Sequence, residues 1–347
     1  GGCVRDSVLN RTPDDWDITT SATPYQVKEL FSKTVDTGLQ HGTVTVMVHG
    51  VGYEVTTYRI DGEYEDGRHP KEVQFTSNLT EDLKRRDFTI NAMAFSLNGD
   101  TFGQLIDPFD GTGDLERLLI RTPCDPDTTF SDDPLRMIRA VRFAAQLGFD
   151  IEPETFDAIE RNRERISIVS KERIVTELNK ILLSPVPSIG FDLFDRCGLL
   201  PLIFPELSRL KGVERVGKHA HKDNFVHTLK VLDNIARHTD KLWLRWAALL
   251  HDIGKPRTKA YDPKTGWTFH GHEVVGSKMV AAIFRELKLP MNEKMKYVQK
   301  LVFLHLRPII LAEDVVTDSA VRRLLFEAGD DIDDLMTLCE ADITSAN

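Results

Sequence analysis

The sequence has few cysteines and no apolar run that approaches the length of a membrane span. Its four cysteines, Cys3, Cys124, Cys197 and Cys339, are scattered and include no C-x-x-C spacing. They therefore suit neither a disulfide framework nor a cysteine-ligated zinc site. We expect free thiols in a reducing cytoplasm. A membrane partner is not expected, because a spanning helix needs about 20 mostly apolar residues.

The chain also lacks an excess of basic charge, since its formal net charge is −10. Proteins that bind nucleic acid usually carry a basic surface, so any RNA contact must depend on local groups of arginine and lysine. Hydrophobic residues make up 41% and charged residues 28%, as in ordinary globular proteins. A chain of 347 residues is long enough for two or three domains.

Two aspartates near the N-terminus, Asp15 and Asp17, form a D-x-D pair. If residues 15–18 lie on a strand, both carboxylates project from the same face. Carboxylates this close repel each other unless a divalent cation lies between them, and hard oxygen ligands suit Mg²⁺. The alternative is a surface cluster in a turn. Glu54, among β-branched residues, could supply a third carboxylate or could face solvent.

Gly1 and Gly2 precede a short helix predicted at residues 4–9. Free backbone N–H groups and the positive end of a helix suit a phosphate group. A metal site beside a phosphate site is typical of nucleotidyl transfer. Gly1 also stands where such a helix would follow a strand, so we expect a hydrophobic strand before it.

Residues 1–124 mix strand and helix signals. A helix is predicted at residues 24–34, and β-branched runs at residues 43–48 and 53–58 predict a hairpin. Residues 61–70 are polar and predict a loop. Arg85-Arg86-Asp87 follows, and an arginine beside a carboxylate can recognise a triphosphate and a ribose. Alone, this tripeptide is weak evidence.

From Asp125 onward the periodicity is helical. Residues 131–133 predict a cap for a helix that ends at Gly148, followed by helices at residues 153–165, 170–183 and 188–197. Asp133 and Arg136 should project from one side of the first helix, where an acceptor and a donor can mimic the edge of a base. The alternative is an acid near the positive helix end paired with an arginine.

A third unit begins near Leu210 and contains most of the histidines. A predicted helix at residues 243–250 ends in the adjacent pair His251-Asp252. The other candidates are distant in sequence and comprise His227, His270, His272, His305 and Asp342. A single histidine on an apolar helix is usually a core residue. This gathering predicts a shared site for one or two divalent metals.

Together these motifs resemble class II polymerase-β-like nucleotidyltransferases, namely the bacterial CCA-adding enzymes and their poly(A) polymerase relatives, fused to an HD domain. The motifs that carry the resemblance, in the family's order, are Gly1-Gly2-x-Val4-Arg5-Asp6, Asp15-x-Asp17, Arg85-Arg86-Asp87 with Ile90-Asn91-Ala92-Met93, Asp107-x-x-x-Gly111 and Asp132-Asp133-x-x-Arg136. The resemblance implies an α+β fold. Its expected parts are a head with a small mixed sheet and flanking helices (1–124), a helical neck with base-recognition and RNA-binding helices (125–209) and an all-α HD domain (210–347).

By this resemblance the protein adds CCA to tRNA 3′ ends from CTP and ATP, without a nucleic-acid template, and releases pyrophosphate. Asp15 and Asp17 would hold Mg²⁺, with Glu54 as a third catalytic candidate. Asp133 and Arg136 would pair with the incoming base, although the family's usual E-D-x-x-R reads D-D-x-x-R here. The full set of nucleotide-binding candidates is Gly1, Gly2, Arg5, Arg86, Asp87, Asn91, Asp133, Arg136 and Arg139.

The C-terminal unit resembles HD phosphohydrolases. His227, His251, Asp252 and Asp342 match the family's ligand positions, whereas His272 and His305 match positions that some members use for a second metal. The expected metal is Mg²⁺ or a divalent transition metal. Alternatives of the same family are poly(A) polymerase and enzymes that add only A or only CC. An alternative of a different class is an HD metal phosphohydrolase acting on cyclic phosphates or nucleotides.

Overall fold

The computed structural model describes residues 1–61, 73–313 and 316–346. Its packing divides the chain into two units, one of residues 1–140 with 148–169 and one of residues 141–147 with 170–347. Helix α6 (Leu135–Leu147) begins in the first unit and ends in the second. The division into three parts at residues 124 and 209 stays a prediction. Apart from Asp61, the predicted loop at residues 61–70 lies outside the described residues.

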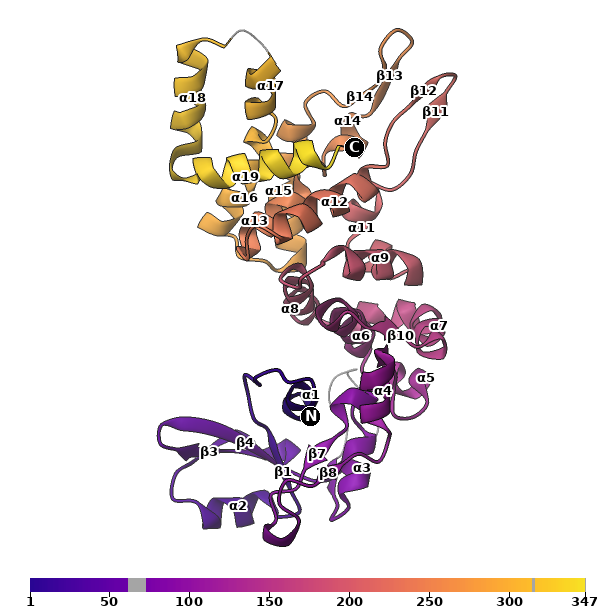
Figure 1. Ribbon diagram of the computed structural model, residues 1–347, viewed down its shortest axis with the longest axis vertical. Coiled ribbons are helices and arrows are strands. Elements are labelled where there is room, and N and C mark those ends of the chain that lie inside the picture. Colours follow the sequence, from indigo (N-terminus) through magenta and orange to yellow (C-terminus); the bar gives the residue numbers. More distant parts are fainter. Residues whose placement is uncertain (62–72, 314–315, 347) are drawn as a thin grey trace. The chain divides into compact units, whose positions relative to one another are not determined.

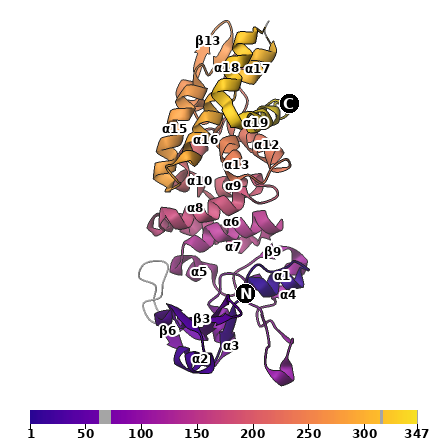
Figure 2. The ribbon, with the colours of Figure 1, turned by 90° about the vertical axis from the view of Figure 1, so that its left-hand side faces the viewer.

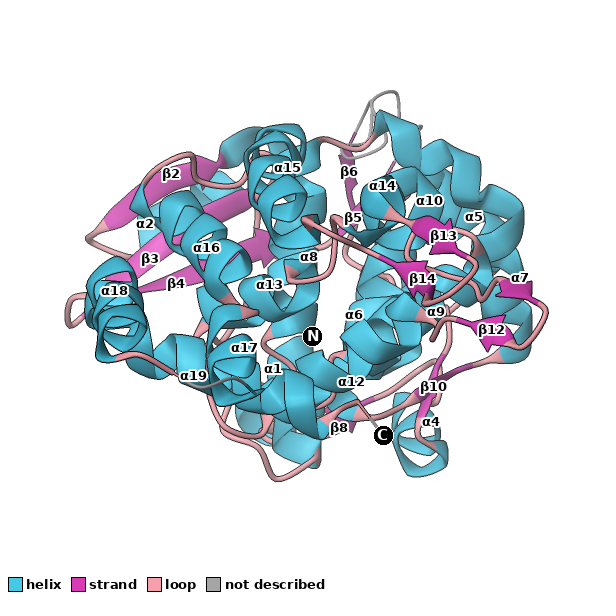
Figure 3. Cartoon of the chain, turned by 90° about the horizontal axis from the view of Figure 1, so that it is seen from above, coloured by secondary structure: helices cyan, strands magenta, loops and turns pink. Residues whose placement is uncertain are grey.

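The first unit contains a four-stranded sheet in the order β1-β4-β3-β2. Its strands are β1 (Ile18–Thr20), β2 (Thr34–Gly38), β3 (Thr43–Val48) and β4 (Val51–Thr57). Strands β3 and β4 form the predicted antiparallel hairpin, and β2 lies beside β3 (Figure 3). Strand β1 runs parallel to β4 on its other side, with Ile18 opposite Val55. The predicted mixed sheet of the head is therefore confirmed.

Helix α2 (Pro24–Leu30) packs on this sheet because alternate strand residues present a β-branched face to it. Its Val27 forms an apolar cluster with Val44, Val46 and Val55. Thr23 caps the helix through a capping box. The helix ends at Leu30, earlier than the predicted residue 34, because Thr34 already pairs with β3.

Short elements complete the first unit. The strand pairs are β5 (Arg59–Asp61) with β6 (Val73–Phe75), β7 (Ala94–Phe95) with β8 (Leu105–Ile106), and β9 (Leu119–Ile120) with β10 (Asp150–Ile151). The helices are α1 (Gly2–Val8), α3 (Leu79–Lys84), α4 (Gly111–Arg117), α5 (Pro126–Asp132) and α7 (Pro153–Asn162). The predicted helix at residues 153–165 becomes a 3₁₀ turn after Asn162.

The second unit is mainly helical, as expected. Its helices are α8 (Lys171–Leu182), α9 (Ser188–Cys197), α10 (Leu200–Ile203), α11 (Pro205–Ser208), α12 (Asn224–Ala236), α13 (Leu242–Leu250), α14 (Lys255–Thr258), α15 (His272–Leu287), α16 (Glu293–Leu304), α17 (Arg307–Glu313), α18 (Asp318–Ala328) and α19 (Ile332–Thr344). Figures 1 and 2 show α15 and α16 side by side. Two short hairpins, which the sequence did not predict, pair β11 (Arg215–Val216) with β12 (His219–Ala220) and β13 (Ala260–Asp262) with β14 (Gly266–Thr268).

Helix α13 forms the centre of the second unit because it is apolar on nearly every side. It contacts α8, α12, α16 and α19, and its Trp246 is fully buried. Its one charged residue, Arg245, donates hydrogen bonds to the carbonyl groups of Leu182, Ser184, Ala236 and Thr239. Carbonyl groups at helix ends need such partners. Arg245 thus ties the ends of α8 and α12 to α13.

The cysteines and the lengths of the helices bear on two expectations from the composition. All four cysteines are free thiols. Across the described parts of the chain, none of the helices combines the length and apolar character that crossing a bilayer requires.

Candidate nucleotide site and metal centre

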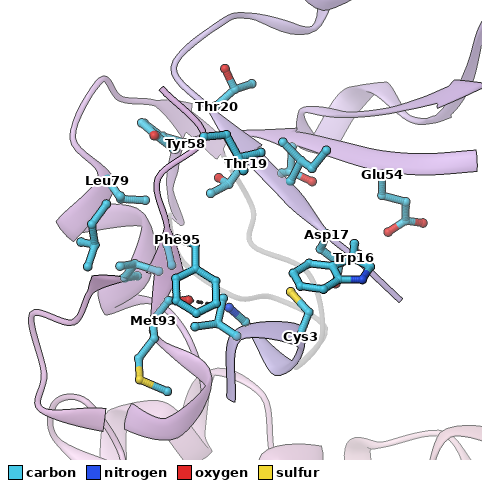
Figure 4. Close-up of a pocket in the computed structure, with 18 of the residues that line it drawn as sticks. Cys3, Trp16, Asp17, Thr19, Thr20, Glu54, Tyr58, Leu79, Met93 and Phe95 are labelled. Carbon is cyan, nitrogen blue, oxygen red and sulfur yellow. Dashed lines mark hydrogen bonds between the residues drawn. The ribbon is translucent and has the colours of Figure 1, made fainter. Parts of the chain in front are cut away.

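A pocket of about 560 Å³ lies in the first unit, within the size range of small-molecule sites. Its walls include Asp17, Glu54, Arg85 and Arg86. Asp17 comes just before β1, and Glu54 comes just before the β4 residue that pairs with Ile18. This register brings the two acids to neighbouring positions beside the pocket (Figure 4). The pocket therefore combines carboxylates and guanidinium groups, which suits a metal–triphosphate complex.

The same-face argument for Asp15 and Asp17 required a strand at residues 15–18, and this condition is not met. Strand β1 begins at Ile18, where its pairing with β4 begins, and residues 15–17 precede it. Both aspartates are exposed, and Asp17 lines the pocket whereas Asp15 does not. Water screens the repulsion between two exposed carboxylates, so their proximity alone does not require a cation. The same-face argument from strand periodicity does not apply either, because neither residue is on a strand.

The glycines and Arg5 belong to the start of α1. Gly1 lines the pocket, whereas Gly2 does not. Arg5 donates from Nη1 to Asn91 Oδ1 at 2.6 Å and from Nε to Asp6 Oδ1 at 3.0 Å. The structure thus joins Arg5 to Asn91, which is 86 residues away in sequence.

Asp87 is the centre of a polar network in the first unit. Its Oδ1 accepts hydrogen bonds from Asn91 Nδ2 (3.1 Å) and from the backbone N–H of Phe88 (2.8 Å). Its Oδ2 lies 2.9 Å from Arg139 Nε and 2.8 Å from Arg139 Nη2. Burial alone would raise the pKa of Asp87. The charge of Arg139 and the hydrogen bonds from Asn91 and Arg139 outweigh it and lower this pKa to about 2.

The predicted helical pair of Asp133 and Arg136 needs a correction. Residues 131 and 132 belong to α5, and Asp133 lies between α5 and α6, so it is not on the helix. Its Oδ1 accepts a hydrogen bond from the N–H of Leu135, the first residue of α6, so Asp133 caps this helix, as predicted for the last residue of the cap at 131–133. A proline at position 134 favours an extended conformation at Asp133, which explains the break. Arg136, on α6, donates to the carbonyl groups of Thr129 and Arg85, both at 3.3 Å.

The second unit brings six predicted residues into one buried cluster. Asp342 lies on α19, His227 on α12 and His272 at the start of α15, while His251, Asp252 and His305 directly follow α13 and α16. His227, His251 and Asp342 form one group and Asp252, His272 and His305 form another. The ligand atoms within each group lie within 4.8 Å of one another. His270, also considered from sequence, is exposed and is not in either group.

Asp252 connects the two groups. Its Oδ2 lies 3.2 Å from His251 Nε2, and its Oδ1 lies 3.2 Å from His272 Nε2 and 3.7 Å from His305 Nε2. In the first group, His227 Nε2 lies 2.7 Å from Asp342 Oδ1. One carboxylate with an oxygen toward each group suits a bridge between two metal ions.

Three of the histidines are oriented in the same way. Nδ1 of His251, His272 and His305 contacts the carbonyl oxygen three residues earlier, at 2.6, 3.0 and 2.5 Å. This contact fixes Nδ1 as the protonated nitrogen and leaves Nε2 as a ligand atom, as in metal sites. The three Nε2 atoms are buried and make no hydrogen bond with any described residue, although each lies near a carboxylate. The donor set therefore fits divalent metal.

Three family models match the chain. The poly(A) polymerase head domain matches residues 1–121, the probable RNA- and SrmB-binding site of polymerase A matches residues 148–211, and the HD domain matches residues 224–347. These matches and the two sites define the class: a polymerase-type nucleotidyltransferase head followed by helical regions and an HD domain.

The relatives give the family. The chain is 51% identical to the CCA-adding enzyme of Lactobacillus johnsonii over 199 residues, or 57% of this chain and 49% of that protein. It is 30% identical to the Bacillus stearothermophilus CCA-adding enzyme solved in complex with CTP, with a TM-score of 0.71 over 100% of this chain and 73% of the other. The chain belongs to the CCA-adding enzyme family. The sequence match spans about half the length of the curated relatives.

A CCA-adding enzyme from Thermotoga maritima complexed with tRNA shares the fold, at 22% identity and a TM-score of 0.66 over 99% of this chain and 73% of the other.

Asp82, a buried acid beside the pocket with 0% exposure, was not predicted from the sequence. Its position three residues before Arg85 was the available signal.

Proposed function

We propose that this chain transfers C and A nucleotides from CTP and ATP to the 3′ end of tRNA, without a nucleic-acid template, and releases pyrophosphate. The observation that carries the proposal is the pocket of the first unit, where Asp17, Glu54 and Arg86 lie together. Family membership supports the choice of CCA addition, because the relatives are named CCA-adding enzymes.

Each predicted nucleotide-binding side chain has a proposed task, and of these side chains Arg86 lines the pocket. Arg86 would contact the triphosphate, because a guanidinium group donates in the planar geometry that phosphate oxygens accept. Asp87, held ionised by Arg139, would accept a hydrogen bond from the ribose, with Asn91 and Arg5 fixing its orientation. Asp133 and Arg136 would select the base. Holding the 3′-hydroxyl and the nucleotide in one geometry supplies a large part of the rate enhancement.

Mg²⁺ is the proposed cofactor of the head, held by Asp15 and Asp17 with Glu54 as the third acid. The fit is good for Asp17 and Glu54, since hard carboxylate oxygens line the same pocket. When bound, the metal would lower the pKa of the attacking hydroxyl and neutralise charge on the phosphates. A protein of this function with free thiols would work in the cytoplasm.

The test is an extension assay with tRNA that lacks its terminal CCA. CTP alone should add two nucleotides, ATP alone should add none, and both together should add three. Continued growth of the tail with ATP would indicate a poly(A) polymerase. Arrest after CC with both nucleotides, or addition of only the final A, would indicate the CC-adding or A-adding members. No extension of any tRNA would contradict the proposal.

A second candidate function rests on the buried cluster of the second unit. Six ligand residues in two groups, bridged by Asp252, support a metal-dependent phosphohydrolase acting on cyclic phosphates or nucleotides. Mg²⁺ or a divalent transition metal would polarise the phosphate and supply a nucleophilic water when bound. Lys255, with Nζ 3.2 Å from Asp252 Oδ2, places a further positive charge beside the site.

This second activity can be separated from the first. Asp252→Ala should abolish hydrolysis of 2′,3′-cyclic AMP and leave tRNA extension near the wild-type rate. If the wild-type protein hydrolyses neither cyclic phosphates nor nucleotides with Mg²⁺, Mn²⁺, Ni²⁺ or Co²⁺, the second unit has a structural role only.

A further inference from the structure

Asp82, on α3, is a fully buried acid, with 0% exposure of its side chain. Aspartate is rarely buried completely, because an ionised carboxylate loses its hydration and must be paired and hydrogen-bonded in return. The groups that compensate Asp82 therefore show what holds it there. It is not one of the residues assigned to nucleotide or metal above.

Three contacts compensate the Asp82 carboxylate. Its Oδ1 accepts a hydrogen bond from the backbone N–H of Arg59 at 3.0 Å and lies 3.4 Å from Arg85 Nε. Its Oδ2 accepts from Arg86 Nη2 at 3.2 Å. Arg59, Arg85 and Arg86 all line the pocket, whereas Asp82 does not. Asp82 thus lies behind the pocket wall and contacts three residues of that wall.

Local structure explains how one acid reaches two consecutive arginines. Asp82 lies in the helix, Arg85 is its C-cap residue, and Arg86 follows, so the arginines are three and four residues further on. Residues at these spacings are neighbours on one side of a helical turn. At the other end, Asn78 caps the helix by accepting from the N–H groups of Thr80 and Glu81. The helix is thus fixed at both ends.

We propose that Asp82 is a positioning residue that orients Arg85 and Arg86 toward the triphosphate of the incoming nucleotide. This inference rests on the nucleotidyl-transfer function proposed above. A guanidinium group has five N–H donors, and the hydrogen bond from Arg86 Nη2 to Asp82 uses only one of them. Orienting the two long side chains before the nucleotide arrives reduces the entropy that binding must otherwise overcome.

Two effects of removing this charge oppose each other. Without Asp82 the pocket is more positive, which by Coulomb's law in a water-filled site favours a triphosphate by about three-fold. Loss of the charge-assisted hydrogen bond to Arg86 and of the ion pair with Arg85 disfavours it by about ten-fold or more. The second effect is larger, so we expect weaker triphosphate binding from Asp82→Asn. A purely electrostatic role would give the opposite sign.

The test compares the dissociation constants of CTP and CMP, measured by calorimetry with Mg²⁺ and without tRNA. Asp82→Asn should raise the Kd for CTP several-fold to ten-fold and leave the Kd for CMP within two-fold, because CMP lacks the β- and γ-phosphates. In steady-state extension, KM for CTP should rise more than kcat falls. These readouts separate positioning from a general loss of structure, which would weaken both nucleotides.

Asp114→Asn is a matched control. Asp114 is also buried (2%) in the first unit and pairs with two arginines, Arg117 at 3.0 Å and Arg121 at 3.2 Å. Neither of these arginines is among the described residues that line the pocket. Asp114→Asn should lower the unfolding temperature but leave the ratio of the CTP and CMP dissociation constants within two-fold of wild type.

If Asp82→Asn does not fold, Asp82→Glu decides. Glutamate keeps the charge that balances the arginines but displaces the carboxylate by one methylene group, so CTP binding should weaken while CMP binding does not. Unchanged or tighter CTP binding in a folded variant would overturn the inference, as would equal weakening of CTP and CMP. Because binding is measured without tRNA, this result stays separate from an extension assay in which the wild type fails.

Discussion

The two sites differ in how complete they are without their ligands. In the second unit, the six ligand residues form two groups of three that are already within contact distance, and all of them are buried except the half-buried Asp342. In the first unit, the proposed metal ligands Asp15 and Asp17 are exposed, and only Asp17 lines the pocket. A buried cluster of like and unlike charges must be pre-organised, because its members cannot be solvated separately. Exposed carboxylates have no such requirement.

This difference suggests a division of roles. The cluster of the second unit joins α12, α13, α15, α16 and α19, so metal bound there would also stabilise the fold. The exposed acids Asp15 and Asp17 stabilise little and are suited to bind metal only together with a nucleotide. The pre-organised part of the first unit is instead the network of Arg5, Asn91, Asp87 and Arg139.

The largest expected effect is on transfer by Asp17→Asn. We expect incorporation of CTP to fall by at least about 10³-fold, because the variant weakens metal binding beside the phosphates. The free energy of unfolding should change by less than about 0.5 kcal/mol, as for other exposed positions. Incorporation is measured by gel with labelled tRNA and stability by urea unfolding. Incorporation near the wild-type rate would remove Asp17 from the catalytic site.

Metal removal from the second unit, unlike Asp17→Asn in the first, should change the stability of the protein. Chelation should lower the unfolding temperature of the second unit, since a metal present at 100 times its Kd stabilises by about 2.7 kcal/mol per site. Metal content, measured by plasma mass spectrometry, should fall in His251→Ala and stay unchanged in His270→Ala, whose exposed side chain is the control. Equal metal content in both variants and wild type would contradict the assignment of this cluster.

Base choice should depend on α6. Arg136→Ala should change the ratio of C to A incorporation by about ten-fold, which corresponds to the 1–3 kcal/mol of a bidentate base contact. The overall rate should fall less than the ratio changes. Competition between CTP and ATP on tRNA that lacks its terminal CA or its terminal A measures the ratio. Arg121→Ala is the control, because Arg121 pairs with Asp114 and has no proposed contact with a base. An unchanged ratio would contradict the role of Arg136 in base selection.

Sequence periodicity predicted the β3–β4 hairpin and several of the longer helices, and its errors have identifiable physical causes. The β-branched runs gave the β3–β4 hairpin because alternate residues are buried against α2. The D-x-D pair is not on a strand, because β1 begins only at Ile18, where it first pairs with the distant strand β4. Pro134 lies between Asp133 and α6, so Asp133 is not part of the helix that was expected to include it.

Long-range contacts were largely beyond the sequence. His227 and Asp342 are 115 residues apart and meet at 2.7 Å. Their pairing was anticipated only from residue type and family resemblance. Nothing in spacing predicts that Arg139 reaches Asp87, 52 residues earlier, or that the Nδ1 atoms of three histidines contact backbone carbonyls. These contacts depend on packing between elements, which no local pattern encodes.

The smallest expected effect concerns acid stability and separates the pre-organised network of the first unit from the metal cluster. The pKa of Asp87 is lowered to about 2 in the folded protein from its usual value of 3.8. A lowered carboxyl pKa stabilises the fold above the unfolded-state pKa. The gain is about 2 kcal/mol, and it is lost as pH falls from about 4 toward 2. In Asp87→Asn this stabilising contribution is absent, so the variant cannot lose it as the pH falls.

The measurement is urea unfolding of wild type and Asp87→Asn between pH 2 and pH 6, with chelator present throughout. Acidic residues of the second unit titrate in both proteins, so the difference between them isolates Asp87. Because Arg139 and Asn91 hold this carboxylate without metal, the difference should persist in chelator and shrink only with pH. A difference that disappears on chelation would mean that Asp87 depends on bound metal, and the contrast between the two sites would then fail.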